Sequence, residues 1–194
     1  MEQNNTLDHL VTRYPRLFRD GPLSNSHLPE GWVAIVDRLC GQIDALLDDA
    51  AVKHFRVRQI KEKFGALRFY WALGGQMTTA VDIIGQGRFE IGPKKPSETF
   101  NKIRALVGEA ETASATACER CGAPSRMRLL AGNYTATTKG YFNLGEEAIP
   151  GDLSHGYMTC LCDAHVDDAA ASWAGKFKEL AGDDDPADDD WEDL

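Results

Sequence analysis

The chain has 194 residues, of which 43% are hydrophobic, and a formal net charge of −9. This length and apolar content suffice for a folded core and exclude a wholly disordered chain. Residues 183–194 carry eight acidic side chains and no basic one, so subtracting the tail's −8 leaves only −1 on residues 1–182.

Residues 1–73 predict helices followed by a β-hairpin. A short helix or turn is expected within 6–20, and a longer amphipathic helix should reach about Asp48, because apolar side chains recur every three or four residues. The apolar stripe of this longer helix contains Val33, Val36, Leu39, Cys40, Ile43 and Leu47. The period changes to two within 52–73, which predicts two strands joined by a turn within 61–65. Gln59 and Ile60 interrupt the alternation, so a bulge or a strand end is expected there.

The stretch 74–96 is rich in glycine and has no clear period. We expect a long loop with one short strand within 88–91, and loops of this length are either functional or mobile. Ser97 is predicted to cap a second helix whose apolar face runs from Phe100 to Ala117. The later predicted elements are short strands at 127–130, 134–139 and 157–159 and a third helix that begins after Cys162.

Two pairs of residues have the spacing of a structural zinc site. Cys118 and Cys121 belong to a Cys-x2-Cys-Gly unit, and Cys162 and His165 belong to a Cys-x2-His unit. Thiolate and imidazole are preferred ligands of tetrahedral Zn²⁺, and a spacing of three on the first turn of a helix places both side chains on one face. Four protein ligands leave no position for water or substrate, which favours a structural ion over a catalytic one.

Two nearby residues remain alternatives for one of these ligands. They are Cys160 and His155. We prefer Cys162 to either, because it pairs naturally with His165.

These elements predict an α+β fold in which a helix packs on a β-hairpin and a treble-clef-like zinc lobe follows. Residues 1–96 should form the helix and hairpin core with its long loop, and residues 97–182 the second helix and the zinc lobe. Residues 183–194 are expected to be a disordered acidic tail, since such a composition cannot bury enough apolar surface to order itself.

The cysteines also bear on the cellular compartment. Four of the five fall within 118–162, which fits metal binding in a reducing compartment better than a disulfide framework. Residues 1–10 lack the pattern of a signal peptide, and no run of 18 apolar residues occurs. We therefore expect a cytoplasmic protein without membrane association, in which Cys40 is a small buried side chain.

The predicted hairpin carries a row of cations beside an aromatic ring. The residues concerned are Arg56, Arg58, Lys61, Lys63, Arg68 and Tyr70. A basic face with an exposed ring can hold phosphates and stack a base, so nucleic-acid contact is one hypothesis. A simple solvated face, or a docking surface for the acidic tail, is the other.

The acidic tail has three interpretations of its own. It is a solubilising extension, a mimic of nucleic-acid charge offered to a basic partner, or a mask over the basic hairpin. Trp191 favours a contact, since an aromatic ring among acids is an anchor type.

No catalytic motif supports an enzyme. The chain lacks His-Glu-x-x-His, and it lacks the His-x-Glu followed by Pro-Cys-x-x-Cys of nucleobase deaminases. An enzyme with an open metal site is therefore kept only as an alternative.

The hairpin motif resembles that of a group of small uncharacterised bacterial and bacteriophage proteins. These pair a Lys-Glu-Lys-Phe-Gly-x-Leu-Arg-Phe-Tyr hairpin, here residues 61–70, with a later Cys-x2-Cys-Gly and a Leu-Cys-x2-His. The similarity covers most of 14–73 and 97–166 and implies a phage or mobile-element origin and a zinc site, but no activity. The stretches 74–96 and 123–159, Cys160 and the acidic tail depart from the pattern of the group, so a specialised role would lie in them.

We therefore expect a non-enzymatic, zinc-stabilised interaction protein of phage or mobile-element type that binds another protein, with inhibition of a host system as one such role. A nucleic-acid-binding module using 53–70 and a metal-dependent enzyme are the alternatives. The sequence defines no oligomeric state.

Overall fold

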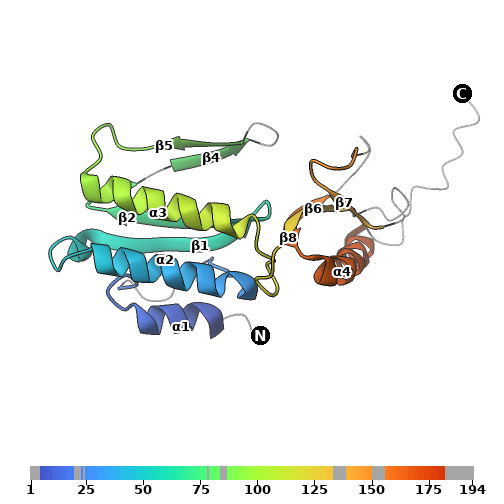
Figure 1. The fold of residues 1–194 in the computed structure, drawn as a ribbon, viewed down its shortest axis with the longest axis horizontal. Coiled ribbons are helices and arrows are strands. Elements are labelled where there is room, and N and C mark those ends of the chain that lie inside the picture. The colour runs from blue at the N-terminus through green and yellow to red at the C-terminus, as the bar shows by residue number, and fades with distance from the viewer. Residues whose placement is uncertain are drawn as a thin grey trace, which may run out of the picture.

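A computed structural model describes residues 5–19, 23, 25–77, 79–83, 87–132, 139–149 and 156–181. Within these residues the chain folds into four α-helices and three small antiparallel sheets of three, two and three strands, which confirms the predicted α+β class. Figure 1 shows two lobes, one containing α1, α2, α3 and the hairpin of β1 and β2, the other containing β6, β7, β8 and α4. Among the described residues, no helix is both long and apolar enough to cross a membrane.

The first lobe packs helices on one face of a β-hairpin (Figure 1). Its elements are α1 (Asn5–Arg13), the 3-10 turn η1 (Glu30–Trp32), α2 (Val33–Leu46), the 3-10 turn η2 (Val52–His54), β1 (Phe55–Lys63), β2 (Ala66–Leu73) and β3 (Gln76–Met77). Four residues of the apolar stripe predicted for the longer helix are buried in α2, and they join the inward-facing residues of the hairpin in one hydrophobic cluster; they are Val36, Leu39, Cys40 and Ile43. Val33 is half-buried, and Leu47 is buried just past the end of α2. Trp32 is the largest fully buried side chain of this cluster.

The hairpin has the predicted strands and turn. Its tip is formed by Phe64 and Gly65, both with positive φ (55° and 71°), as a tight two-residue hairpin requires. A Cβ on Gly65 would lie 2.2 Å from the sulfur of Met127, whose side chain would have to shift, and 3.1 Å from the carbonyl carbon of Thr159. The register of β1 on β2 shifts between Val57 and Gln59, close to the predicted interruption.

The stretch 74–96 contains more strand than predicted. The expected strand is β5 (Gly87–Ile91), but it pairs with an unpredicted strand, β4 (Thr79–Ile83). Thr79, Val81 and Ile83 are β-branched and favour extended backbone, a signal obscured by the surrounding glycines.

The helix α3 (Glu98–Ser114) begins as predicted, with the Ser97 hydroxyl accepting a hydrogen bond from the backbone N–H of Phe100 at 3.1 Å. Its buried side chains belong to the first hydrophobic cluster, and the ring of Phe100 lies 4.6 Å from that of Trp71. The domain boundary expected at residue 96 would therefore place α3 in a different domain from the side chains against which it packs.

The second lobe is a three-stranded sheet with one helix. Its elements are β6 (Arg126–Leu130), β7 (Tyr141–Asn143), β8 (Tyr157–Leu161) and α4 (Asp163–Ala181), with the strands in the order β7-β6-β8. The strands predicted at 127–130 and 157–159 correspond to β6 and β8. The one predicted at 134–139 falls mostly outside the described residues, and β7, which follows it, was not predicted.

The two lobes are joined by specific contacts around the start of α2. The backbone N–H of Gly31 donates to the carbonyl oxygen of Glu119 at 2.8 Å, and the indole N–H of Trp32 donates to that of Ala117 at 2.8 Å. On the other side, the hydroxyl of Tyr157 donates to the carboxylate of Glu62 at 3.1 Å. The second lobe is thus anchored to both the helices and the hairpin of the first.

Candidate metal centre

The structure brings the four predicted ligands together. Cys118 and Cys121 lie in the metal loop, residues 118–122, which follows α3. Cys162 directly follows β8, and His165 lies on the first turn of α4. The three sulfur atoms and one ring nitrogen all lie within 4.8 Å of one another, so the cluster is positioned to hold a metal ion.

The distances between the candidate ligand atoms match a tetrahedral thiolate and imidazole site. The Sγ atoms of Cys121 and Cys162 are 3.8 Å apart, and the Sγ of Cys118 is 3.6 Å from Nδ1 of His165. With Zn–S near 2.3 Å and Zn–N near 2.1 Å, tetrahedral geometry places two sulfurs about 3.8 Å apart and a sulfur about 3.6 Å from a nitrogen. The pair Cys162 and His165 is slightly closer, at 3.3 Å. The donor set and its spacing therefore fit Zn²⁺.

The metal loop has the tight turn expected for its sequence. The N–H of Gly122 donates to the carbonyl oxygen of Cys118 at 2.8 Å, and the N–H of Cys118 donates to that of Ala123 at 2.8 Å. Gly122 has a φ of 73°, which favours glycine, and a Cβ there would lie 2.8 Å from the carbonyl oxygen of Gly31. The loop is thus shaped both by its own turn and by contact with the start of α2.

The electrostatics of the cluster lower the pKa of one thiol, that of Cys118, and raise the pKa of another, that of Cys162. Burial raises the pKa of Cys118, but hydrogen bonds from the backbone at Cys162, Cys121 and Arg120 outweigh it and bring the pKa to about 6. The pKa of Cys162 is raised by burial and by the neighbouring thiols of Cys118 and Cys121. Clustered thiols resist simultaneous ionisation, and a bound cation removes that resistance.

A buried arginine that the sequence did not reveal forms hydrogen bonds on both sides of Cys162, one of the second pair of candidate ligands. Arg128 on β6 is only 2% exposed, and its guanidinium donates to the side chains of Asn143 and Asp163 and, at 3.3 Å, to the carbonyl oxygen of Leu161. Two of these three partners flank Cys162 in the chain. Arg128 therefore fixes the backbone that presents this ligand, as supporting side chains around metal sites commonly do.

Glu119, also missed, ties the metal loop to β8. Its carboxylate accepts hydrogen bonds from the N–H of Cys160 at 2.7 Å and the hydroxyl of Thr159 at 2.8 Å. Burial raises the pKa of Glu119 to about 7, although these hydrogen bonds oppose the rise. The neighbouring ligand Cys118 is thus held to β8 as well as to α3.

Neither alternative ligand belongs to the cluster among the described residues. The sulfur of Cys160 lies in the first hydrophobic cluster, with hydrogen bonds to the hydroxyl of Ser125 at 2.9 Å and the carbonyl oxygen of Ala115 at 3.1 Å. It is not among the four atoms that surround the candidate site. His155 lies outside the described residues.

The predicted basic face is only partly exposed. Arg56 and Arg58 are exposed, whereas Lys61, Lys63 and Tyr70 are half-buried, and the ammonium of Lys61 lies 5.4 Å from the centre of the Tyr70 ring. Arg68 is 8% exposed and donates to the carbonyl oxygen of Leu67.

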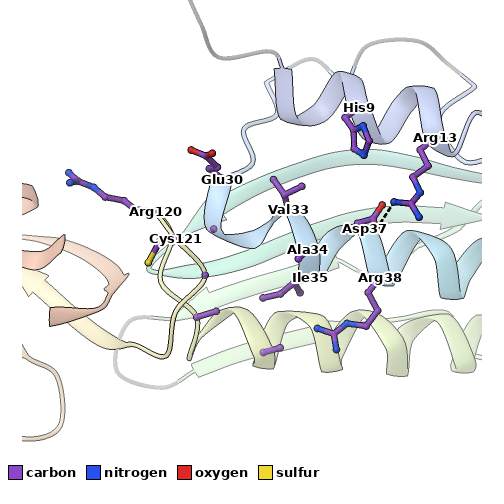
Figure 2. Close-up of a pocket in the computed structure, with 14 residues that line it drawn as sticks. His9, Arg13, Glu30, Val33, Ala34, Ile35, Asp37, Arg38, Arg120 and Cys121 are labelled. Carbon is purple, nitrogen blue, oxygen red and sulfur yellow. Dashed lines mark hydrogen bonds and ion pairs between the residues drawn. The ribbon is translucent and has the colours of Figure 1, made fainter. Parts of the chain in front are cut away.

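A groove of about 1140 Å³ runs along α2 and ends at the metal loop. Small or apolar residues line its floor, namely Gly31, Val33, Ala34, Ile35, Ala113, Ala117 and Gly122. The remaining lining residues are Cys121 and the six polar residues His9, Arg13, Glu30, Asp37, Arg38 and Arg120. Figure 2 shows His9 and Arg13 on α1 on one side of α2, and Arg120 and Cys121 on the metal loop at one end.

Comparison of the chain with known protein families, with characterised proteins and with solved structures finds no match. The fold and the candidate site are therefore interpreted from their own geometry.

Proposed function

We propose that this protein is a non-enzymatic binding protein, in which a structural zinc ion held by Cys118, Cys121, Cys162 and His165 fixes a protein-binding groove. One observation carries the proposal: the metal loop packs directly on η1, the turn that leads into α2, so the loop that supplies two candidate ligands is also the end wall of the groove. An ion bound to this loop would therefore also fix the shape of the binding surface.

The packing of the metal loop on α2 is close. The Cα of Gly31 faces the loop so tightly that a Cβ there would lie 2.0 Å from the carbonyl oxygen of Cys118 and 2.5 Å from the nitrogen of Gly122. Both of these are backbone atoms, which cannot move aside without displacing the loop. The groove floor and its end wall therefore form one unit.

The geometry gives less support to an enzyme. An ion held by all four side chains has no open position for water or substrate, so the ion would stabilise the fold rather than take part in a reaction. Cys121 is a candidate ligand, and in Figure 2 it lies on a different wall of the groove from His9. The groove is better suited to contact than to chemistry.

The binding role is tested by filling the groove without touching the metal site. Ala34 is exposed on the floor, and Ala34→Arg places a long side chain there while keeping a helix-compatible residue. Ala105→Arg is the matched control, since Ala105 is exposed on α3 and does not line the groove.

We expect both variants to retain one zinc ion per chain by mass spectrometry of the metal. Affinity capture from lysate of the source cells should lose the same partner in Ala34→Arg and in chelator-treated wild type, and keep it in Ala105→Arg. Capture that is equal in all samples would contradict the proposal.

The basic hairpin supports a second candidate function, nucleic-acid binding. The specific observation is that Arg56 and Arg58 point away from the core on the strand that also holds Lys61 over Tyr70. A salt-dependent gel shift that is lost in Arg58→Glu and kept in Ala34→Arg would favour this function over the first.

A further inference from the structure

We propose that the groove binds the acidic C-terminal segment of the same chain, residues 183–194, with Trp191 seated on the groove floor. This inference rests on the proposed function, because it takes the groove to be a binding surface. It adds the chemistry of the occupant: an acidic peptide with one aromatic anchor.

The charge of the groove is complementary to such a segment. The groove is lined by three arginines, Arg13, Arg38 and Arg120, and by only two carboxylates, those of Glu30 and Asp37. Asp37 is already engaged with Arg13, at 2.9 Å.

Arg38 and Arg120 are exposed, and neither forms an ion pair within the described part of the chain. The tail has eight carboxylates and no cation to offer them. Carboxylates pair well with the fixed fork of an arginine side chain.

The floor of the groove suits an aromatic anchor. It is built from small residues such as Ala34, Ala113 and Ala117, which leave room above α2. The volume of about 1140 Å³ is slightly above the usual range for ligand pockets, about 300–1000 Å³, so an indole and its flanking backbone can be accommodated. Trp191 is the one aromatic residue in 183–194.

The tail is long enough to reach the groove. The helix α4 has 19 residues and is therefore about 28 Å long. It begins beside the metal centre, where the sulfur of Cys162 lies 3.8 Å from that of Cys121 on the groove wall. Trp191 lies ten residues after Ala181, and a fully extended chain of that length spans up to about 33 Å. At full extension Trp191 can thus return along α4 to the end of the groove that Cys121 and Gly122 line.

The basic hairpin is the competing site for the tail. Its cations lie on a strand face, where the ring of Tyr70 is already covered by Lys61 at 5.4 Å and Arg58 contacts the sulfur of Met77 at 3.9 Å. The hairpin can attract carboxylates, but the groove offers both cations and a hollow apolar floor. The groove therefore accounts for the tryptophan as well as for the charge.

The experiment uses the full-length protein labelled with 5-fluorotryptophan and observed by fluorine NMR. Its four tryptophans give four resonances, and Trp191→Phe assigns the one from the tail. We expect the Trp191 resonance of the zinc-loaded protein to lie away from its position in urea and to move to that position in 0.5 M salt. The double variant Arg38→Glu/Arg120→Glu should produce the same loss of shift at low salt.

Three variants separate the possible sites. Arg104→Glu, at an exposed position of α3 outside the groove, is the matched control and should leave the resonance unchanged. A resonance at the urea position in wild type would overturn the inference. A shift that is lost in Arg58→Glu/Lys61→Glu but kept in Arg38→Glu/Arg120→Glu would overturn it in favour of the hairpin. A shift that grows with protein concentration would overturn it in favour of a second copy.

These failures are distinct from failure of the proposed function. If the Trp191 resonance is unshifted while capture remains sensitive to Ala34→Arg, the groove binds a partner and only the tail inference fails. If capture is insensitive to Ala34→Arg, the proposed function fails whatever the position of the resonance.

Discussion

Replacing Gly31 by alanine is the most direct perturbation of the contact between the metal loop and α2. The added Cβ would lie 2.0 Å from the carbonyl oxygen of Cys118, 2.5 Å from the nitrogen of Gly122 and 2.9 Å from the nitrogen of Cys121. Because all three are backbone atoms, the loop has to move away from α2. The backbone dihedrals of Gly31 are not of the positive-φ kind, so the effect is one of space and not of strain.

The magnitude of this effect follows from the contacts that would be lost. Displacing the loop breaks the hydrogen bonds from Gly31 to Glu119 and from Trp32 to Ala117, each contributing about 1 kcal/mol. Overpacking of a filled site adds about 1–3 kcal/mol. We therefore expect Gly31→Ala to lower the free energy of unfolding by about 3–5 kcal/mol and to weaken zinc binding.

The assay is urea unfolding of the zinc-loaded protein, followed by circular dichroism, together with competition for zinc against a chromophoric chelator. Gly108→Ala is the control, since Gly108 lies in α3 and a Cβ there meets nothing within 4 Å. That change should stabilise the protein by about 0.5–1 kcal/mol, because alanine favours a helix interior. Equal stability and zinc affinity in Gly31→Ala and wild type would refute the claimed contact.

Three further predictions concern the centre and its surroundings. Arg128→Met keeps an apolar stem but removes the hydrogen bonds around Cys162. Because Asp163 is 79% exposed, water can solvate its carboxylate, so the free energy of unfolding in urea should fall by only about 2 kcal/mol. The affinity for zinc should be about 10–100-fold weaker. Arg126→Met, at an exposed position of the same strand, should change neither by more than about 0.5 kcal/mol. Removal of zinc by a chelator should lower the circular dichroism signal of helix α4, while hydrogen exchange in β1 and β2 stays slow. Loss of protection against exchange in both lobes would contradict the presence of two separate hydrophobic clusters. In the native protein Cys40, whose pKa burial raises to about 12, should not react with a thiol reagent, and reaction without unfolding would contradict its burial.

The cluster of candidate metal ligands could be predicted because its signal is local. Cys118 with Cys121, and Cys162 with His165, each lie three residues apart, so each pair is preformed by one turn of chain. The helices α2 and α3 were predictable for the same reason, since their apolar periods are continuous. The predicted cap, Ser97, is likewise determined by its own neighbours.

The support around the site could not be predicted, because it depends on residues distant in sequence. Gly31 meets the metal loop across more than 80 residues, and its role appears only when the two lobes are in contact. Arg126 and Arg128 are alternate residues of β6, and nothing local shows that the second is the buried one. Its partner Asp163 lies 35 residues away.

The groove had no sequence signal either. Its floor combines small residues from α2, α3 and the metal loop, whose packing determines the hollow. Small residues on helices are common, and only their placement beside Gly31 and Gly122 makes a surface of them. The cations of the hairpin were a stronger signal in the sequence, yet Arg68 among them is almost fully buried.

In the proposed zinc site, four protein ligands surround the ion and leave no coordination position open. X-ray absorption of the full-length, zinc-loaded protein measures the number and kind of ligand atoms directly. A closed site predicts three sulfurs at about 2.3 Å, one nitrogen at about 2.0–2.1 Å and no oxygen. An oxygen ligand, or fewer than three sulfurs, would contradict the closed site and restore a catalytic metal as the better interpretation.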